Sequence, residues 1–176
     1  DIWRVATRDN QAAFMVADGL GHGPSAATAS RTVAAVFDRD PTAAPARFLE
    51  QAHAEAAHTR GAAVAALNLD LGTGAVRYAG IGNIAGSILT NGIGKGMFSH
   101  NGTLGAQMRK PQEFEYAWPA GSLLVMHSDG IQSRWSLADY PGLSQRDPAL
   151  IAALLARDFR RGHDDVTVLV ARLEHA

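Results

Sequence analysis

The sequence of 176 residues contains no cysteine. This excludes a disulfide framework, a thiolate zinc site and a cysteine nucleophile. An excess of one charge is also lacking, because 16 basic and 17 acidic side chains leave a formal net charge of -1. Nucleic-acid-binding proteins usually carry a strong basic excess, and no apolar run approaches the roughly 20 residues of a membrane-spanning helix. With no recognisable signal peptide either, we expect a cytoplasmic protein without nucleic-acid or membrane partners.

The composition that remains is that of a folded domain. Hydrophobic residues make up 47% of the chain and charged residues 19%, which argues against both disorder and a coiled coil. A chain of this length can bury about 70% of its unfolded surface. We expect residues 1–176 to form one domain. Because the first residue is Asp1 and not methionine, we also expect that some N-terminal sequence is lacking.

The first hairpin can be placed by arithmetic. Alternating or continuous apolar residues predict two antiparallel strands, over residues 2–7 and 12–17. If the hairpin turns between Asp9 and Asn10, facing residues have numbers that sum to 19, and Asp1 then lies opposite Asp18. Like charges in this position destabilise a sheet. A cation between the two carboxylates would explain the pair.

The rest of the chain predicts two consecutive helices followed mainly by strands. Helical spacing of apolar residues is seen over residues 24–40, 45–58 and 148–160, the last with an apolar face of Leu150, Ile151, Leu154, Leu155 and Phe159. Strands are predicted over residues 63–70, 75–81, 84–90, 113–118, 122–126 and 166–172. The turn at 119–121 predicts that the two strands beside it pair with each other. Residues 91–105 are expected to form a loop and residues 131–147 a mobile insert. This order favours an α+β domain with sheets covered by helices.

Aspartates stand at the ends of several predicted strands. Asp18 and Asp129 each end an apolar strand and precede a glycine, and Asp164 and Asp165 lead into the last strand. Hard divalent ions prefer oxygen ligands, and two such ions can clamp a phosphoryl group for in-line attack. A single Asp-Gly is more often a plain turn. The combination is what indicates a metal site, provided that the strands bring these ends together.

Three motifs carry a family resemblance. Their sequences, in chain order, are Asp-Gly-Leu-Gly-His-Gly at 18–23, His-Ser-Asp-Gly-Ile at 127–131 and Asp-Asp-Val-Thr-Val at 164–168. They resemble the metal-dependent protein serine/threonine phosphatases of the type 2C class. The first motif resembles the bacterial branch typified by the stage II sporulation E phosphatase, and within it the RsbX-like feedback phosphatases. Residues 1–3 resemble the end of that branch's Gly-Asp-x-Trp motif, and residues 102–105 also match.

The resemblance implies a fold, a metal site and a set of ligands. The fold is a four-layer β-sandwich of two antiparallel sheets flanked by helices, with two Mn²⁺ or Mg²⁺ ions at one end. Asp18 is expected to bridge both ions, and the carbonyl of Gly19 to bind one. The remaining expected ligands are Asp1 near the first ion, Asp129 and Asp164 at the other, and Asp165 orienting the site or replacing Asp164. Asp18, Asp129 and Asp164 are the expected catalytic residues.

The implied activity is hydrolysis of phosphoserine or phosphothreonine. The RsbX-like resemblance implies a small regulatory protein of the antagonist type as substrate, in a bacterial partner-switching stress or sigma-factor pathway. Related chains fuse this domain to an upstream kinase-like domain, so the intact protein is also expected to be a candidate for such a fusion. The alternative is a non-catalytic sensor or binding module with a phosphatase fold.

Some positions depart from the family or leave two interpretations open. Eukaryotic members have a histidine after the Asp-Gly, often assigned as general acid, where this chain has Leu20. No counterpart to their phosphate-binding arginine is recognisable. His22 and His163 lie beside predicted ligands, but loop or turn roles are the simpler interpretation. Asn83 either shapes a loop near the site or is a plain turn residue, and the turn is the simpler interpretation. Trp135 either packs or contacts a protein substrate.

Overall fold

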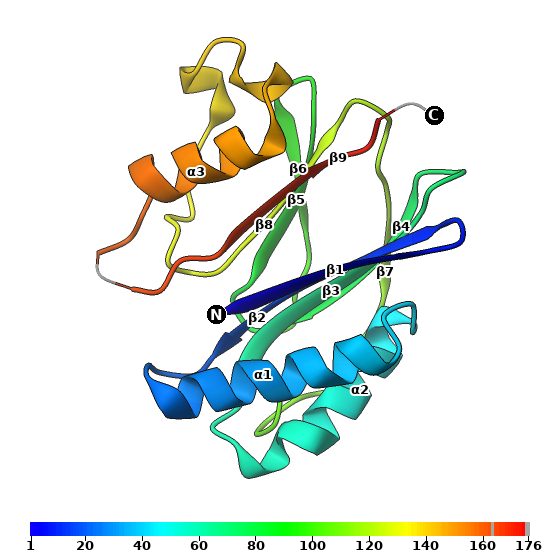
Figure 1. The fold of residues 1–176 in the computed structure, drawn as a ribbon, viewed down its shortest axis with the longest axis vertical. Coiled ribbons are helices and arrows are strands. Elements are labelled where there is room, and N and C mark those ends of the chain that lie inside the picture. The colour runs from blue at the N-terminus through cyan, green and yellow to red at the C-terminus, as the bar shows by residue number, and fades with distance from the viewer. Residues whose placement is uncertain (163, 175–176) are drawn as a thin grey trace.

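The computed structural model describes residues 1–162 and 164–174, which form two antiparallel sheets (Figure 1). The first sheet has the order β1 (Ile2–Arg8), β2 (Gln11–Gly19), β3 (Ala62–Asp70), β4 (Ala75–Ile81) and β7 (Phe114–Ala117). The second has the order β6 (Ile93–Met97), β5 (Ala85–Thr90), β8 (Leu123–His127) and β9 (Val168–Arg172). The helices are α1 (Pro24–Arg39), α2 (Pro45–Glu55) and α3 (Pro148–Asp158), with short 3-10 turns at Ala56–His58, Leu137–Asp139 and Leu143–Gln145. Helices α1 and α2 cover the first sheet and α3 covers the second, which confirms the predicted four-layer sandwich.

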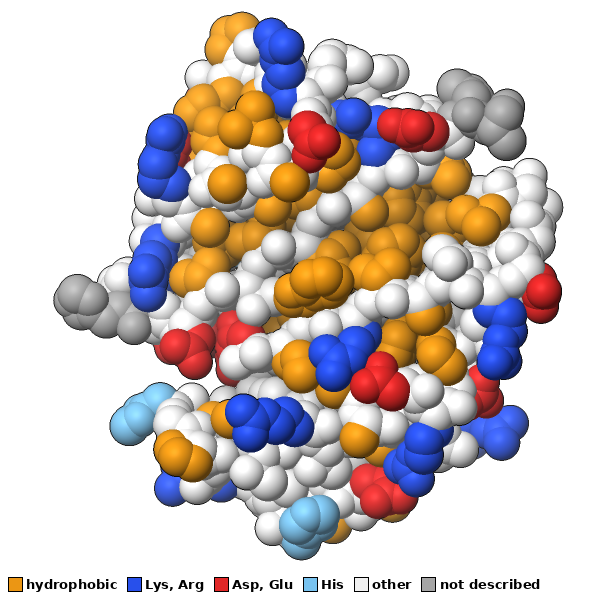
Figure 2. All heavy atoms as spheres, viewed as in Figure 1, with side chains coloured by type: hydrophobic (Ala, Val, Ile, Leu, Met, Phe, Trp, Pro, Cys, Tyr) orange, Lys and Arg blue, Asp and Glu red, His pale blue; other side chains and the backbone are white. Residues whose placement is uncertain are grey.

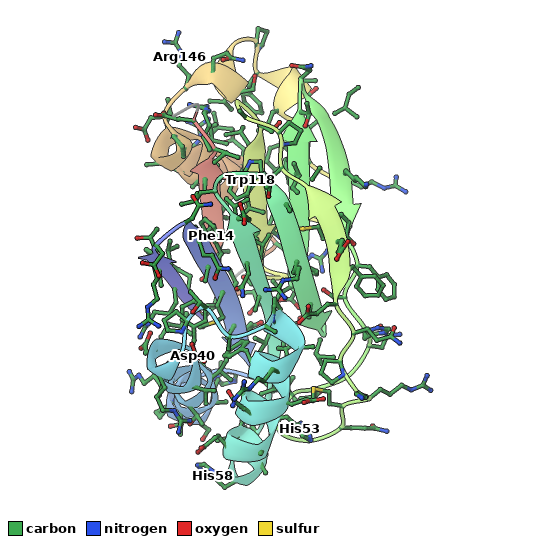
Figure 3. All side chains as sticks on the ribbon, turned by 90° about the vertical axis from the view of Figure 1, so that its right-hand side faces the viewer. Phe14, Asp40, His53, His58, Trp118 and Arg146 are labelled. Carbon is green, nitrogen blue, oxygen red and sulfur yellow. The ribbon has the colours of Figure 1, made fainter. Side chains whose placement is uncertain are left out.

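Alternation along the strands produces three apolar layers. Met15 on β2 packs toward the helices, whereas its neighbour Phe14 packs between the sheets. Phe14 meets Trp118 there, with ring centroids 5.7 Å apart, and both are labelled in the middle of the molecule in Figure 3. A third layer lies between the second sheet and α3, where Ile151 and Leu155 are fully buried. Successive strand residues thus serve different cores, because their side chains point to opposite faces.

The register of the first hairpin agrees with the arithmetic. Arg8 faces Gln11 and Ile2 faces Ala17, so every pair sums to 19. Asp1 precedes β1 and Asp18 lies near the end of β2, so both stand at the open end of this hairpin.

Two predicted elements differ from the structure. Strands β7 and β8 do not pair with each other: β7 pairs with β4 in the first sheet, whereas β8 lies between β5 and β9 in the second. The turn at 119–121 therefore carries the chain from one sheet to the other. The expected loop at 91–105 contains β6, which pairs with β5 and forms the edge of the second sheet.

Two further expectations concern the region around α3. The expected insert at 131–147 holds two 3-10 turns whose residues Leu137 and Leu143 are buried against the second sheet. Leu150, predicted on the apolar face of α3, is 51% exposed. That helix buries Ile151 and Leu155, one turn apart, and Leu154 and Phe159 pack against the same layer, whereas Leu150 is not part of it.

One side of the sandwich exposes apolar side chains that no helix covers. Figure 2 shows apolar side chains across the middle of this face, between the two helical layers. Trp3 and Val5 on the edge strand β1 are 55% and 44% exposed. Within the described residues, no helix combines the length and the apolar character needed to cross a membrane.

Candidate metal centre

The ends of four segments that carry predicted ligands lie at one end of the sandwich. The N-terminus, the end of β2, the end of β8 and the start of β9 meet there in Figure 1, and acidic side chains gather at the same place in Figure 2. The β8–β9 pairing continues past the strands, because Ser128 N–H donates to the Thr167 carbonyl at 3.1 Å and Thr167 N–H donates to Ser128 Oγ at 3.0 Å. This extension carries Asp129 and Asp165 to the same edge.

Gly130 shows how closely these segments approach. A Cβ on this residue would lie 2.1 Å from the Asp165 carbonyl oxygen, so only glycine leaves room for that backbone. The Asp-Gly of this motif is therefore a packing requirement of the site. It is more than a plain turn.

Asp18 has a raised pKa because of its surroundings in the site. Its pKa is raised from 3.8 to about 6, first by burial and then by the negative charge of Asp129. The α-amino group of Asp1 opposes this increase, and the charges of Asp164 and Asp165 add to it. Three other carboxylates therefore repel the charge of Asp18, and they come from segments more than 100 residues away in the chain.

Asp1 places two more oxygens in the site. Both carboxylate oxygens are buried, and neither has a hydrogen-bond partner in the described part of the chain. Burying a charge without a partner is costly. In the register of this hairpin Asp1 lies opposite Asp18, and a cation at this end of the hairpin would relieve the unsatisfied carboxylate of Asp1.

Asp129 is held by a residue that the sequence interpretation assigned to a turn. Asn83 Nδ2 donates to Asp129 Oδ2 at 2.6 Å. Asn83 lies in the β4–β5 connection, 46 positions from its partner. The only signal for this role was its place after Gly82, which was too general to single it out.

The residues after Asp18 form the side of the candidate site that lies next to α1. Gly19 packs against α1, where a Cβ would lie 2.0 Å from the Ala26 carbonyl oxygen. Leu20, at the position of the eukaryotic histidine, is 51% exposed and donates its N–H to the Gly61 carbonyl at 2.9 Å. Arg60 lies beside this loop, its Nη1 3.2 Å from where a Cβ on Gly21 would stand. This basic group was missed because it lies far from every motif.

Asp164 and Asp165 are exposed at the entrance to β9. Asp164 Oδ1 accepts the Asp165 N–H at 3.0 Å, and Arg160 Nη2 donates to the Asp164 carbonyl at 3.0 Å. His22 is also exposed, while His163 lies outside the described residues. Over residues 1–162 and 164–174, no three Asp, Glu, His or Cys side chains are grouped tightly enough to hold a metal ion.

The residues nevertheless fit a hard divalent cation in kind. All donors are carboxylates, one pair of oxygens is buried without partners, and the carboxylates raise the pKa of their central member. The exposed carboxylates of Asp164 and Asp165 would have to turn inward about their side-chain torsions to complete a ligand set.

Comparisons with known proteins agree with this fold. The family model of stage II sporulation protein E (SpoIIE) matches residues 8–174. No curated protein matches. A solved chain from work on the bacterial stressosome, described as a modular system adapted to control secondary messenger signaling, is 28% identical with a TM-score of 0.88, covering 97% of this chain and 90% of that one.

Two more distant structures share the fold. RsbX in complex with magnesium is 19% identical with a TM-score of 0.80, covering 96% of this chain and 84% of that one. The Mycobacterium tuberculosis serine/threonine phosphatase PstP/Ppp is also 19% identical, with a TM-score of 0.71, covering 98% and 92%. These likenesses confirm the resemblance inferred from the motifs. The chain belongs to the stage II sporulation protein E (SpoIIE) family of type 2C-class phosphatases.

Proposed function

We propose that this chain is a metal-dependent phosphatase that hydrolyses phosphoserine or phosphothreonine on a small regulatory protein. The observation that carries the proposal is the gathering of carboxylates from distant segments around Asp18, whose pKa is raised to about 6. Such an arrangement costs free energy unless a cation offsets it. The family match and the likeness to a stressosome chain support a stress-response or partner-switching pathway.

The proposed ligands are those that the motif resemblance indicates. Asp1, Asp18, Asp129, Asp164 and the Gly19 carbonyl would hold two Mn²⁺ or Mg²⁺ ions. Asp165 would orient the site or replace Asp164. When bound, two such ions polarise a water molecule and the phosphoryl group for an in-line displacement.

The chain's own residues have separate tasks in this reaction. Asn83 fixes one oxygen of Asp129 and leaves the other free to act as a ligand. Arg60, beside the loop that follows Asp18, supplies a positive charge toward an incoming phosphate dianion. Leu20 has no proton to give, so the leaving serine oxygen takes its proton from solvent, to which this exposed loop is open.

We further propose that the substrate is a phosphorylated antagonist-type protein and that both act in the cytoplasm. A kinase-like domain upstream of residue 1 in the intact protein is a further proposal, which the intact coding sequence tests. The motif resemblance to RsbX-like phosphatases supports these assignments.

The test is hydrolysis of p-nitrophenyl phosphate and of a phosphoserine peptide, with and without Mn²⁺. We expect Mn²⁺-dependent turnover, and a loss of at least 100-fold in Asp129→Asn. Asp139→Asn, an exposed aspartate on a 3-10 turn, is the matched control and should keep full activity. Full activity in Asp129→Asn would overturn the assignment.

Calorimetric titration with Mn²⁺ separates the enzyme from the alternative, a non-catalytic phosphatase-fold module. Binding with turnover supports the enzyme. No binding at millimolar Mn²⁺ would favour the module, in which the separation of the carboxylates is permanent.

A further inference from the structure

A groove lies on the outer face of the second sheet, where α3 does not cover it. It has a volume of about 440 Å³. Its floor is made by β5 and β6, and its wall by the segment that follows the Asp129 motif. The floor includes Ala85, Ser87, Gly94 and Gly96, and the wall includes Trp135 and Leu137.

Neither backbone conformation nor close packing requires glycine at positions 94 and 96 of the floor. Neither Gly94 nor Gly96 has a positive φ. A Cβ on Gly96 would meet nothing within 4 Å, and one on Gly94 would meet only Leu89 Cγ at 3.8 Å, an ordinary contact. Glycine weakens a strand, and within a strand it often marks a place where a ligand or another backbone approaches closely. Both glycines face the same groove.

The wall is fixed in place. Trp135 Nε1 donates to His127 Nε2 at 3.0 Å, and the other nitrogen of that ring lies 2.8 Å from the Ser128 carbonyl oxygen. Leu137, two residues beyond Trp135, is buried in the layer beneath α3. A rigid aromatic wall opposite a glycine floor binds a chain segment with little loss of conformational freedom, because the site is already formed.

The groove opens toward the carboxylate end of the sandwich. Ala85 on the floor faces His127 in the sheet register. Asn83 lies two positions before Ala85, and Asp129 lies two positions after His127. A hydrogen bond joins Asn83 to Asp129. From Ala85 to Leu89 the floor follows five strand positions, about 13 Å at roughly 3.3 Å per residue step. An extended segment of about five residues fits this length.

We propose that this groove binds an extended, uncharged segment of the phosphoprotein substrate adjacent to its phosphorylated residue. The inference rests on the proposed phosphatase function. The main chain of the segment lies over Gly94 and Gly96, and an apolar side chain packs against Trp135. No charged side chain lines the groove within the described residues, which favours an uncharged segment over an acidic or basic one. Trp135 thus has a substrate-facing role, one of the two interpretations that its sequence context allowed.

The experiment compares substrates of different length. The probes are p-nitrophenyl phosphate, the tripeptide Ala-phosphoSer-Ala, and a 13-residue peptide in which six Ala, Ser or Thr residues flank phosphoserine on each side. We expect the natural chain with Mn²⁺ to have at least a tenfold higher kcat/KM for the 13-residue peptide than for the tripeptide.

Gly96→Val fills the groove without a clash, and valine favours strands. It should abolish the length preference while leaving the p-nitrophenyl phosphate and tripeptide rates within twofold. Gly94→Val serves as the second variant if the first folds poorly. The matched control is Ala117→Val, on the exposed edge strand of the other sheet, which should keep the length preference.

A binding measurement keeps the two proposals separable. Fluorescence anisotropy of the labelled 13-residue peptide in EDTA reports the groove without catalysis, and Gly96→Val should weaken binding at least fivefold. If nothing is hydrolysed but Gly96→Val still weakens binding, the phosphatase proposal fails and the groove stands. If both valine variants leave the length preference and the binding unchanged, or if Ala117→Val changes them equally, the groove proposal is wrong.

Discussion

Replacing Asp18 by asparagine should make the metal-free protein more stable while destroying the metal centre. Burial of this carboxylate, and after it the negative charges of Asp129, Asp164 and Asp165, raise its pKa from 3.8 to about 6. A neutral amide of the same shape removes the burial cost of the charge and these repulsions. The fold therefore bears a local cost at the residue on which the proposed function depends most.

The magnitude follows from the linkage between pKa and stability. The interval from 3.8 to about 6 corresponds to about 3 kcal/mol at about 1.36 kcal/mol per pH unit. Because Asp18 is partly exposed, solvent screening reduces this to roughly 1–1.5 kcal/mol. The folded state binds the proton more tightly than the unfolded state, so stability falls as the pH rises from about 4 to 6 and the cost is complete above that interval.

The assay is thermal unfolding in EDTA at pH 7.5 and at pH 4. We expect Asp18→Asn to unfold about 2–6 °C higher than the natural chain at pH 7.5, and the difference to vanish at pH 4. Saturating Mn²⁺ should stabilise the natural chain at pH 7.5 but not the variant, because only the natural chain binds it.

Asp70→Asn is a control of opposite sign. Asp70 accepts N–H groups from Gly72 and Thr73, both at 2.9 Å, and the hydrogen bonds to Thr73 are the main reason its pKa is lowered. Its stabilising contribution is present at neutral pH and is lost as the pH falls, so its removal should lower the unfolding temperature at pH 7.5. If Asp18→Asn destabilises the metal-free protein, or stabilises it equally at both pH values, the electrostatic reasoning is refuted.

Three further substitutions test other parts of the site and fold. Asn83→Ala should weaken Mn²⁺ binding about tenfold by calorimetry, because the 2.6 Å bond that orients Asp129 is lost; unchanged affinity would contradict this role. Gly130→Ala should lower the unfolding temperature by at least about 5 °C, since its Cβ would meet the Asp165 carbonyl; an equally stable variant would show that this backbone can move freely. Leu150→Glu should change unfolding free energy by less than about 0.5 kcal/mol in a denaturant titration, and a larger loss would mean that this exposed residue packs.

The local geometry was the most predictable part of the fold. The first hairpin register followed from one turn position, because each residue number fixes its partner once the turn is known. The helices followed from apolar spacing, because α1 and α2 each bury one face against the first sheet. In both cases the information lies within a few neighbouring residues.

The pairing of β7 and β8 could not be predicted in the same way. The turn at 119–121 has the composition of a hairpin turn, but Trp118 before it is buried between the sheets and donates Nε1–H to the Ser122 carbonyl at 3.0 Å. Gly121 N–H then donates to the Leu173 carbonyl, in the segment that follows the other sheet's edge strand. Leu173 lies far along the chain from Gly121, so turn composition alone cannot distinguish a hairpin from a crossing.

The proposed ligands could be identified from local sequence, but the contacts that arrange them could not. The aspartates were identified from motifs at the ends of apolar strands. Two of them precede a glycine, and at Gly130 a Cβ would lie 2.1 Å from the Asp165 carbonyl oxygen. Asn83 was assigned to a turn because its partner Asp129 lies 46 positions away, across a pairing of β5 with β8 that no local pattern encodes. Its amide holds Asp129, one of the three carboxylates whose charges raise the pKa of Asp18. Orientation of this kind depends on which strands are neighbours, so it becomes visible only when the sheet order is known.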